Sequence, residues 1–184
     1  MTLVAERLIT VSEFLERDDF EEGYIYELIN GTIMKRASPN AEHQNAVLNI
    51  AAIMRAYVLE KNLGKCYIAP LDVVFDNFDL VQPDVLFIAK ERLNIVSKFI
   101  EGAPDLVVEV LSQGTVKMDR NEKLKTYRKN GVSEYWIVDY KKKSIEIYAL
   151  KDGDYDMVSY GDETGEVESV LLEGLKVNIE AIFE

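Results

Sequence analysis

Apolar residues follow two different patterns along this chain, and each pattern predicts a different element. Residues 41–62 carry apolar side chains at helical spacing, which predicts a long amphipathic helix that Gly64 ends. Short, unbroken apolar runs rich in valine are typical of strands buried on both faces. We expect strands at 65–75, 84–89, 105–111, 134–139 and 144–150.

Turn and capping residues divide these elements. Asn30-Gly31 predicts a two-residue hairpin turn within 24–36, and Pro70 predicts a bend inside the strand at 65–75. Thr10, followed three residues later by Glu13, predicts a capped helix over 10–18. Two further helices are expected at 117–130 and 178–183.

The order of elements predicts one α+β, or mixed α/β, domain over 1–184, with a sheet that carries helices on both sides. The chain has 48% hydrophobic and 29% charged residues, which is an ordinary globular balance. It has no apolar run long enough for a membrane span and no signal-peptide pattern. Because Cys66 is the only cysteine, an internal disulfide is excluded, and we expect a cytoplasmic protein.

Charge and histidine content narrow the chemistry. A net charge of −12 argues against non-specific nucleic-acid binding, although basic residues do gather between Lys117 and Lys129. His43 is the only histidine, so a Cys/His zinc site is not expected.

Glu109 is the most informative residue, because it interrupts the apolar run from Leu106 to Leu111. A buried carboxylate is costly unless it is neutral, paired or bound to a metal. Strand alternation puts Glu109 on the face where Asp84 would meet it, if strands 84–89 and 105–111 pair. Two such carboxylates indicate an Mg²⁺ site for phosphodiester hydrolysis, and a structural ion pair is the alternative for Glu109. Asp84 alone is equally well explained as turn chemistry.

The helix at 117–130 supplies a cation. Arg120, Lys123 and Tyr127 follow helical spacing and are expected to share a face. Lys123 is then placed to orient the attacking water or to offset charge at phosphorus, while a solvated charged helix is the other interpretation. Lys125 is the alternative lysine, but it is expected to face away from Tyr127.

Three other polar residues carry weaker signals. Glu27 and Asp72 lie in predicted strands, where each is a possible acidic ligand or water anchor and where a solvent-facing carboxylate is the commoner case. His43 lies in the first turn of the long helix, where a cap or a packing residue is the commoner role than a base.

The chain resembles the PD-(D/E)XK, or restriction-endonuclease-like, nuclease superfamily, and more closely the bacterial Uma-two family of endonucleases. The resemblance rests on stretches that follow one another in order over most of the chain, at residues 26–31, 69–73, 82–87, 102–112 and 122–139.

The resemblance implies a mixed four-stranded sheet flanked by helices, with a metal site at one edge. It implies that Asp84 and Glu109 hold the metal and that Glu27 assists. The usual motif lysine would stand where this chain has Leu111. The resemblance therefore implies that the lysine has migrated to Lys123, or that the site is degenerate. Asp105 is set aside, because it lies on the same strand as Glu109.

The resulting hypothesis is a Mg²⁺- or Mn²⁺-dependent DNA endonuclease that uses Asp84, Glu109, Lys123 and Glu27, and that pairs as a homodimer. Two alternatives stay open. One is a catalytically silent module with the nuclease fold, whose acidic surface contacts a protein. The other is a metal-dependent hydrolase of a small phosphorylated substrate.

Overall fold

A computed structural model describes residues 7–112 and 118–184. Within this part of the chain, the larger sheet has six strands in the order β11-β10-β9-β8-β6-β3. Strands β8 and β9 run parallel and the other neighbours run antiparallel, so the sheet is mixed. The bounds are β3 Gly64–Ile68, β6 Val85–Ala89, β8 Leu106–Val110, β9 Glu134–Asp139, β10 Ser144–Lys151 and β11 Asp154–Asp162.

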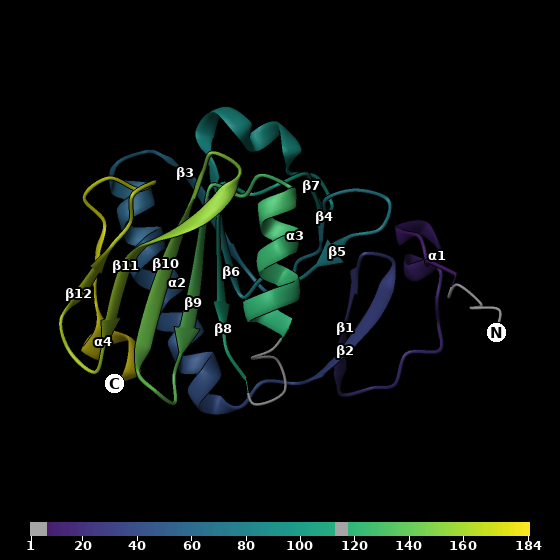
Figure 1. The fold of residues 1–184 in the computed structure, drawn as a ribbon, viewed down its shortest axis with the longest axis horizontal. Helices are drawn as coiled ribbons and strands as arrows, with labels where there is room; N and C mark the ends of the chain where they lie inside the picture. Colours follow the sequence, from purple (N-terminus) through teal and green to yellow (C-terminus); the bar gives the residue numbers. More distant parts are fainter. Residues whose placement is uncertain (1–6, 113–117) are drawn as a thin grey trace.

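A second sheet has the strand order β2-β1-β5-β4-β7, and a short hairpin pairs β12 with β13. Figure 1 shows the β1–β2 hairpin beyond α3, on the side of the molecule away from α4. The bounds are β1 Tyr24–Ile29, β2 Thr32–Ala37, β4 Val73–Val74, β5 Leu80–Val81, β7 Ile100–Glu101, β12 Glu166–Glu168 and β13 Lys176–Asn178.

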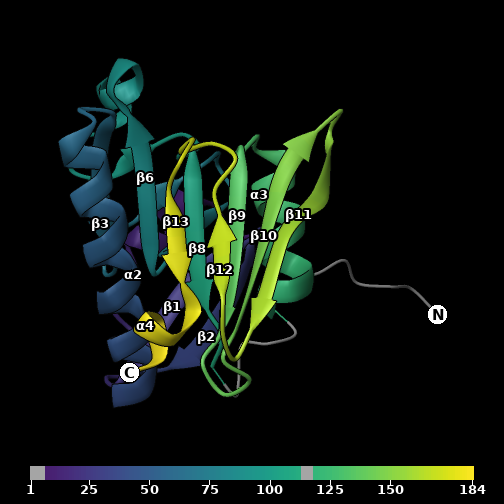
Figure 2. The same cartoon turned by 90° about the vertical axis from the view of Figure 1, so that its left-hand side faces the viewer.

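Helices cover both faces of the larger sheet. Figure 2 shows the β12–β13 hairpin and α4 in front of the sheet and α3 behind it. Helix α2 packs on the front face, because its buried side chains join Val108, Trp136 and Ile179 in one core cluster. Tyr127 of α3 packs on the other face with Val107 and Ile137. The bounds are α1 Val11–Leu15, α2 Ala41–Glu60, α3 Leu124–Lys129 and α4 Ile179–Phe183.

The mixed architecture with flanking helices is confirmed, but three details of the prediction are wrong. The larger sheet has six strands where a core of four was expected, because β11 and β3 extend it at its two edges. The expected strand 65–75 is two strands, β3 and β4, in different sheets. Pro70, placed between them, cannot donate to a ladder, so the chain leaves one sheet there for the other.

The expected helix at 117–130 is the third correction. Its described part begins as a π-helix over Met118–Lys123 and continues as α3, whereas residue 117 lies outside the described residues. The wider turn rotates Arg120 away from the face of Lys123 and Tyr127. Arg120 instead contacts Glu146 of β10 at 2.6 Å. No helix of residues 7–112 and 118–184 has the length and apolarity needed to cross a membrane.

Candidate functional site

Asp84 and Glu109 meet at one end of the larger sheet. Strands β6 and β8 pair with Val85 opposite Val108, and continuing this register by one residue sets Asp84 opposite Glu109. The predicted pairing of these two strands is confirmed. The backbone N–H of Val110 donates to Asp84 Oδ2 at 2.8 Å, which fixes the aspartate across the strand gap.

Glu109 is buried and uses one carboxylate oxygen for two hydrogen bonds. Lys123 Nζ donates to Oε1 at 2.8 Å and the Tyr127 hydroxyl donates to the same oxygen at 2.5 Å. Burial raises the pKa of Glu109 to about 8 against the attraction of Lys123, and the negative charges of Asp119, Asp84 and Glu27 raise it further. The Glu109 carboxyl therefore keeps its proton to a higher pH than an ordinary glutamate does.

Asp84 is shifted in the opposite direction. Burial alone would raise the pKa of Asp84, but the His43 side chain and the charges of Arg36 and Lys123 together lower it. His43 Nε2 lies 3.3 Å from Asp84 Oδ2. Two neighbouring carboxyls with pKa values pushed apart are a recurrent feature of active sites.

Lys123 joins Glu109 to Glu27. Its ammonium is fully buried and lies 3.0 Å from Glu27 Oε1 as well as 2.8 Å from Glu109 Oε1. Burial lowers the pKa of Lys123, but the attraction of Glu109, Glu27 and Asp119 outweighs it, so the pKa is raised. Lys123 is thus a permanent cation. It stands in the last turn of a π-helix, an irregularity that is frequent at functional sites.

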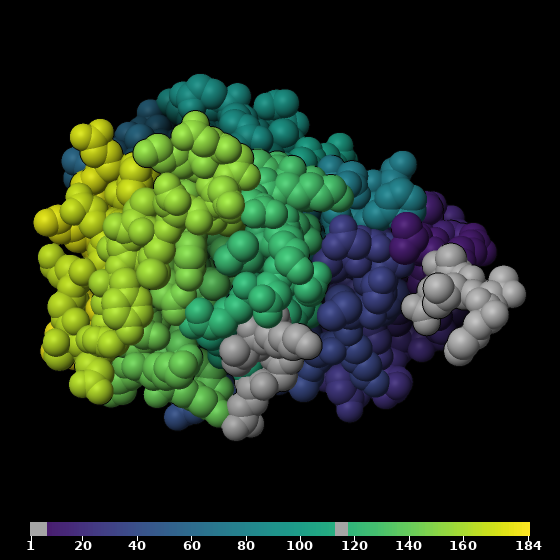
Figure 3. Space-filling model, in the orientation of Figure 1, coloured from purple at the N-terminus to yellow at the C-terminus, as the bar shows by residue number. Residues whose placement is uncertain are grey.

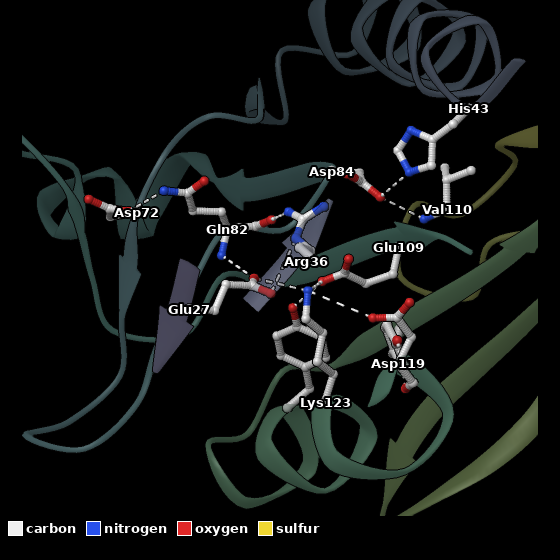
Figure 4. Close-up of polar contacts among 12 residues, drawn as sticks. Glu27, Arg36, His43, Asp72, Gln82, Asp84, Glu109, Val110, Asp119 and Lys123 are labelled. Carbon is white, nitrogen blue, oxygen red and sulfur yellow. Dashed lines mark hydrogen bonds and ion pairs between the residues drawn. The ribbon is translucent and has the colours of Figure 1, made fainter. Parts of the chain in front are cut away.

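Glu27 belongs to a second layer of contacts behind Lys123. The backbone N–H of Gln82 donates to Glu27 Oε1 at 2.7 Å, and Arg36 Nε lies 3.4 Å from Oε2. Arg36 also donates to the carbonyl oxygen of Gln82, and the Gln82 amide donates to Asp72 (Figure 4). These bonds hold the segment before Asp84 in place.

The cluster contains more acid than base. Its buried acids are Glu27, Asp84, Glu109 and Asp119, and its permanent cations are Arg36 and Lys123. A buried excess of negative charge favours uptake of a proton or of a metal cation.

These side chains line a narrow hollow whose walls lie too close together to leave room for a water molecule. Its wall combines residues from β2, β6, β8, the N-terminal end of α2 and the π-helix. The lining side chains are those of Arg36, Ala37, Pro39, His43, Asp84, Glu109, Val110, Ser112, Asp119 and Lys123.

The donor set fits a hard divalent cation with few protein ligands. In the part of the chain that the structure describes, no three His, Cys, Asp or Glu side chains converge to enclose a metal on their own. Mg²⁺ usually takes one or two carboxylates and completes its shell with water and substrate phosphate. Asp84 and Glu109 meet that requirement, since both line the hollow.

The structure assembles the residues singled out in the sequence and adds three. Glu27, Asp84, Glu109 and Lys123 converge, while Lys125 has a side chain 60% exposed and Asp105 pairs with Arg92 elsewhere. Asp72 reaches the cluster only through Gln82. The residues that sequence reasoning missed as site residues are Arg36, His43 and Asp119.

One feature of the sequence could have indicated that His43 is a site residue. It lies in the first turn of α2, three residues after the N-cap Asn40, where the side chain points back toward the helix start. Its ring is buried, and its Nδ1 atom has no hydrogen-bond partner among the described residues.

Comparisons with known proteins agree with the fold. The model of the Uma2 family, described as "Putative restriction endonuclease", matches residues 11–180. The uncharacterized protein sll1609 of Synechocystis sp. is 25% identical over 177 residues, covering 91% of this chain and 96% of that protein. A crystal structure of a "putative nuclease belonging to DUF820" from Anabaena variabilis superposes with a TM-score of 0.80 at 19% identity. That likeness covers 95% of this chain and 97% of the other.

Proposed function

This chain belongs to the Uma2 family of restriction-endonuclease-like proteins, and from that premise we propose that it is a Mg²⁺- or Mn²⁺-dependent endonuclease acting on DNA. The observation that carries the proposal is the convergence of Asp84, Glu109 and Lys123 on one hollow. The position of the usual motif lysine holds Leu111, whose side chain is packed in the core. Lys123 takes the role of that lysine instead, because it contacts Glu109 from the turn before α3.

Asp84 and Glu109 are the residues that would hold the metal. A divalent cation held there would supply polarisation of the phosphate and a more acidic water. The protein contributes a carboxylate that is already ionised, Asp84, and a buried Glu109 whose proton a cation would displace. Metal uptake and proton release are therefore expected to be linked.

Lys123 is proposed to stabilise charge. Water attacks phosphorus in line with the leaving oxygen, the bond from phosphorus to that oxygen breaks, and the proton lost by the water passes through solvent to the leaving oxygen, while negative charge grows on the phosphate oxygens. Because the pKa of Lys123 is raised, its ammonium stays protonated and cannot act as the base. It would offset the developing charge and orient the water, with Glu27 holding its position at 3.0 Å.

His43 is proposed as a positioning residue. Its Nε2 atom contacts the Asp84 oxygen that also accepts from Val110. These two contacts on Oδ2 orient the carboxylate, and partners of this kind commonly tune metal ligands.

Nicking of supercoiled plasmid tests the proposal. We expect nicking in Mg²⁺ and in Mn²⁺, none in EDTA, and a loss of roughly 100-fold or more for Glu109→Gln. Equal nicking by Glu109→Gln, purified identically, would reject the site. No nicking by the wild-type protein at low salt and high protein concentration would reject the endonuclease.

A small phosphodiester is the second candidate substrate class. It is favoured by the net charge of −12. It is also favoured by the basic residues between 118 and 129, because each of them pairs with an acid. The pairs are Arg120–Glu146, Lys123–Glu109, Lys125–Glu122, Arg128–Asp154 and Lys129–Asp79. Hydrolysis of bis-p-nitrophenyl phosphate without plasmid nicking would support this alternative.

A further inference from the structure

An endonuclease with this charge needs a basic surface beside its site, and the segment 118–129 does not supply one. Its lysines and arginines are neutralised by neighbouring acids, as shown above, and Lys117 lies outside the described residues. Another basic surface must therefore meet the phosphates that flank the one being cut.

The turn between β9 and β10 carries three consecutive exposed lysines, Lys141, Lys142 and Lys143. Among the described residues, Lys141 and Lys143 have no carboxylate within 4.0 Å, and Asp139 is the one acid within that distance of Lys142, at 3.9 Å. Glu163 lies on the same surface pocket as the three lysines. This lysine turn thus carries more positive than negative charge.

The lysine turn has a fixed shape. Asp139 Oδ1 accepts from the backbone N–H groups of Lys141 and Lys142, both at 3.1 Å. The carbonyl oxygen of Lys143 accepts from the Glu163 N–H at 2.9 Å. A turn held at both ends presents its side chains from a defined place, which reduces the entropy lost when a ligand binds.

The lysine turn lies beside the candidate site. Tyr140, the residue before it, accepts a hydrogen bond from Asn40 at 3.2 Å, and its ring packs edge-on against His43 with centroids 6.3 Å apart. In Figure 1 this turn, the end of β8 and the start of α2 share the lower edge of the molecule, and Figure 3 shows the turn at the surface there.

A surface groove continues from the first turn of α2 to the lysines. Its lining includes Ala41, Asn45, Tyr140 and Lys143, together with Phe183 and the acids Glu42 and Glu184, and Ala41 lies two residues before His43. A strand whose phosphate lies at the mouth of the hollow, beside His43 and Asp84, can therefore continue along the Lys143 side of this groove.

We propose that Lys141, Lys142 and Lys143 bind the phosphate backbone of DNA next to the cleaved bond. This inference rests on the proposed endonuclease and names the surface that holds its substrate. The contacts are with phosphates, so they add affinity and position without reading sequence.

The test measures DNA binding separately from hydrolysis. A labelled DNA duplex is titrated with protein over a series of salt concentrations, in Ca²⁺ and again in EDTA. The test variant is Lys141→Gln/Lys142→Gln/Lys143→Gln. The matched control is Lys65→Gln/Lys98→Gln/Lys151→Gln, which removes the same charge from exposed lysines elsewhere on the surface.

We expect the lysine-turn variant to bind roughly 10-fold more weakly at moderate salt. The slope of log Kd against log salt should fall by about 0.9 for each lysine that contacts a phosphate. The control variant should bind like the wild-type protein, and both variants should melt at the wild-type temperature because their lysines are exposed.

Two outcomes would overturn the inference. An unchanged slope in the lysine-turn variant, beside a wild-type protein that binds and nicks DNA, would reject the lysine turn and leave the endonuclease standing. A wild-type protein that binds no duplex at low salt would also reject it, and the nicking assay would then decide separately whether the endonuclease falls too.

Discussion

Two buried glutamates on neighbouring parallel strands show how differently a protein can accommodate the same side chain. Glu109 of β8 and Glu134 of β9 are 2% and 1% exposed. Glu134 pairs with Leu106, and Glu109 lies three residues after Leu106 on β8. Because side chains alternate between faces along a strand, the two glutamates point to opposite faces of the larger sheet. Glu134 accepts from Trp136 and Ser169 on one oxygen and from the N–H groups of Val170 and Leu171 on the other.

Neutral donors satisfy both oxygens of Glu134, and no cation is involved in these bonds. Glu109 instead concentrates Lys123 and Tyr127 on one oxygen, faces three other acids and lines a hollow. Burial of a carboxylate in an apolar strand is therefore no sign of chemistry by itself. What distinguishes Glu109 is the lysine among its donors and the surrounding negative charge.

The largest expected effect comes from removing the cation on which Glu109 depends. Lys123→Met leaves Glu27 and Glu109 buried without their shared partner. We expect a loss of about 3–5 kcal/mol in the free energy of unfolding, measured by urea titration. Lys123→Met/Glu109→Gln should recover part of that loss. A cost below about 1 kcal/mol for Lys123→Met would mean that the contacts of Lys123 with Glu27 and Glu109 do not hold the site together.

The pH dependence of stability sharpens the comparison next. Because burial raises the pKa of Glu109 to about 8, the folded state keeps a proton that the unfolded state has already lost. Stability of the wild-type protein therefore falls as the pH rises from about 5 to about 8, and Glu109→Gln escapes this loss. We expect the variant's stability relative to wild type to grow by at least about 1.4 kcal/mol over that window, in metal-free thermal unfolding. A pH-independent difference would contradict the raised pKa.

His43→Ala tests whether His43 positions Asp84 and so belongs to the same site as Glu109. We expect a loss of about 10- to 100-fold in Mn²⁺ affinity and in nicking rate. His43→Gln can keep a donor near the Nε2 position and should retain more of both. Equal loss in the two variants, or an unchanged Mn²⁺ affinity in His43→Ala, would leave His43 as a packing residue.

The smallest effect is expected at Arg120, which was predicted to share the face of Lys123 but pairs with Glu146 instead. Arg120→Gln removes a partly exposed ion pair and should cost about 0–1 kcal/mol, with wild-type nicking. A nicking rate of Arg120→Gln as low as that of Glu109→Gln would mean that Arg120 is a site residue.

Local sequence patterns were sufficient for the strands that carry the acids. Strand alternation applies around Glu109 in the structure, since Val107 and Leu111 lie in one core and Val108 in the other. Helical spacing singled out Lys123 and the family resemblance pointed to the same residue, but spacing along a helix does not say which strand end the lysine faces.

The missed residues have physical reasons in common. His43, Arg36 and Asp119 reach the hollow from three separate elements, so only the tertiary fold brings them together. The π-helix that turns Arg120 away has no pattern in the sequence that we recognise. Arg128 and Lys129 pair with acids that are distant in the sequence, so these pairs cannot be predicted before the fold is known either.

Calorimetric titration with Mn²⁺ tests the contrast between the two glutamates most directly. Wild-type, Glu109→Gln and Glu134→Gln proteins are titrated in two buffers that differ in ionisation enthalpy, at a temperature where all three are folded. We predict that wild-type and Glu134→Gln bind Mn²⁺ with proton release, that Glu109→Gln does not bind, and that Glu134→Gln loses about 1–3 kcal/mol of stability. Equal Mn²⁺ binding by Glu109→Gln, or loss of binding in folded Glu134→Gln, would contradict the assignment of the metal site to Glu109.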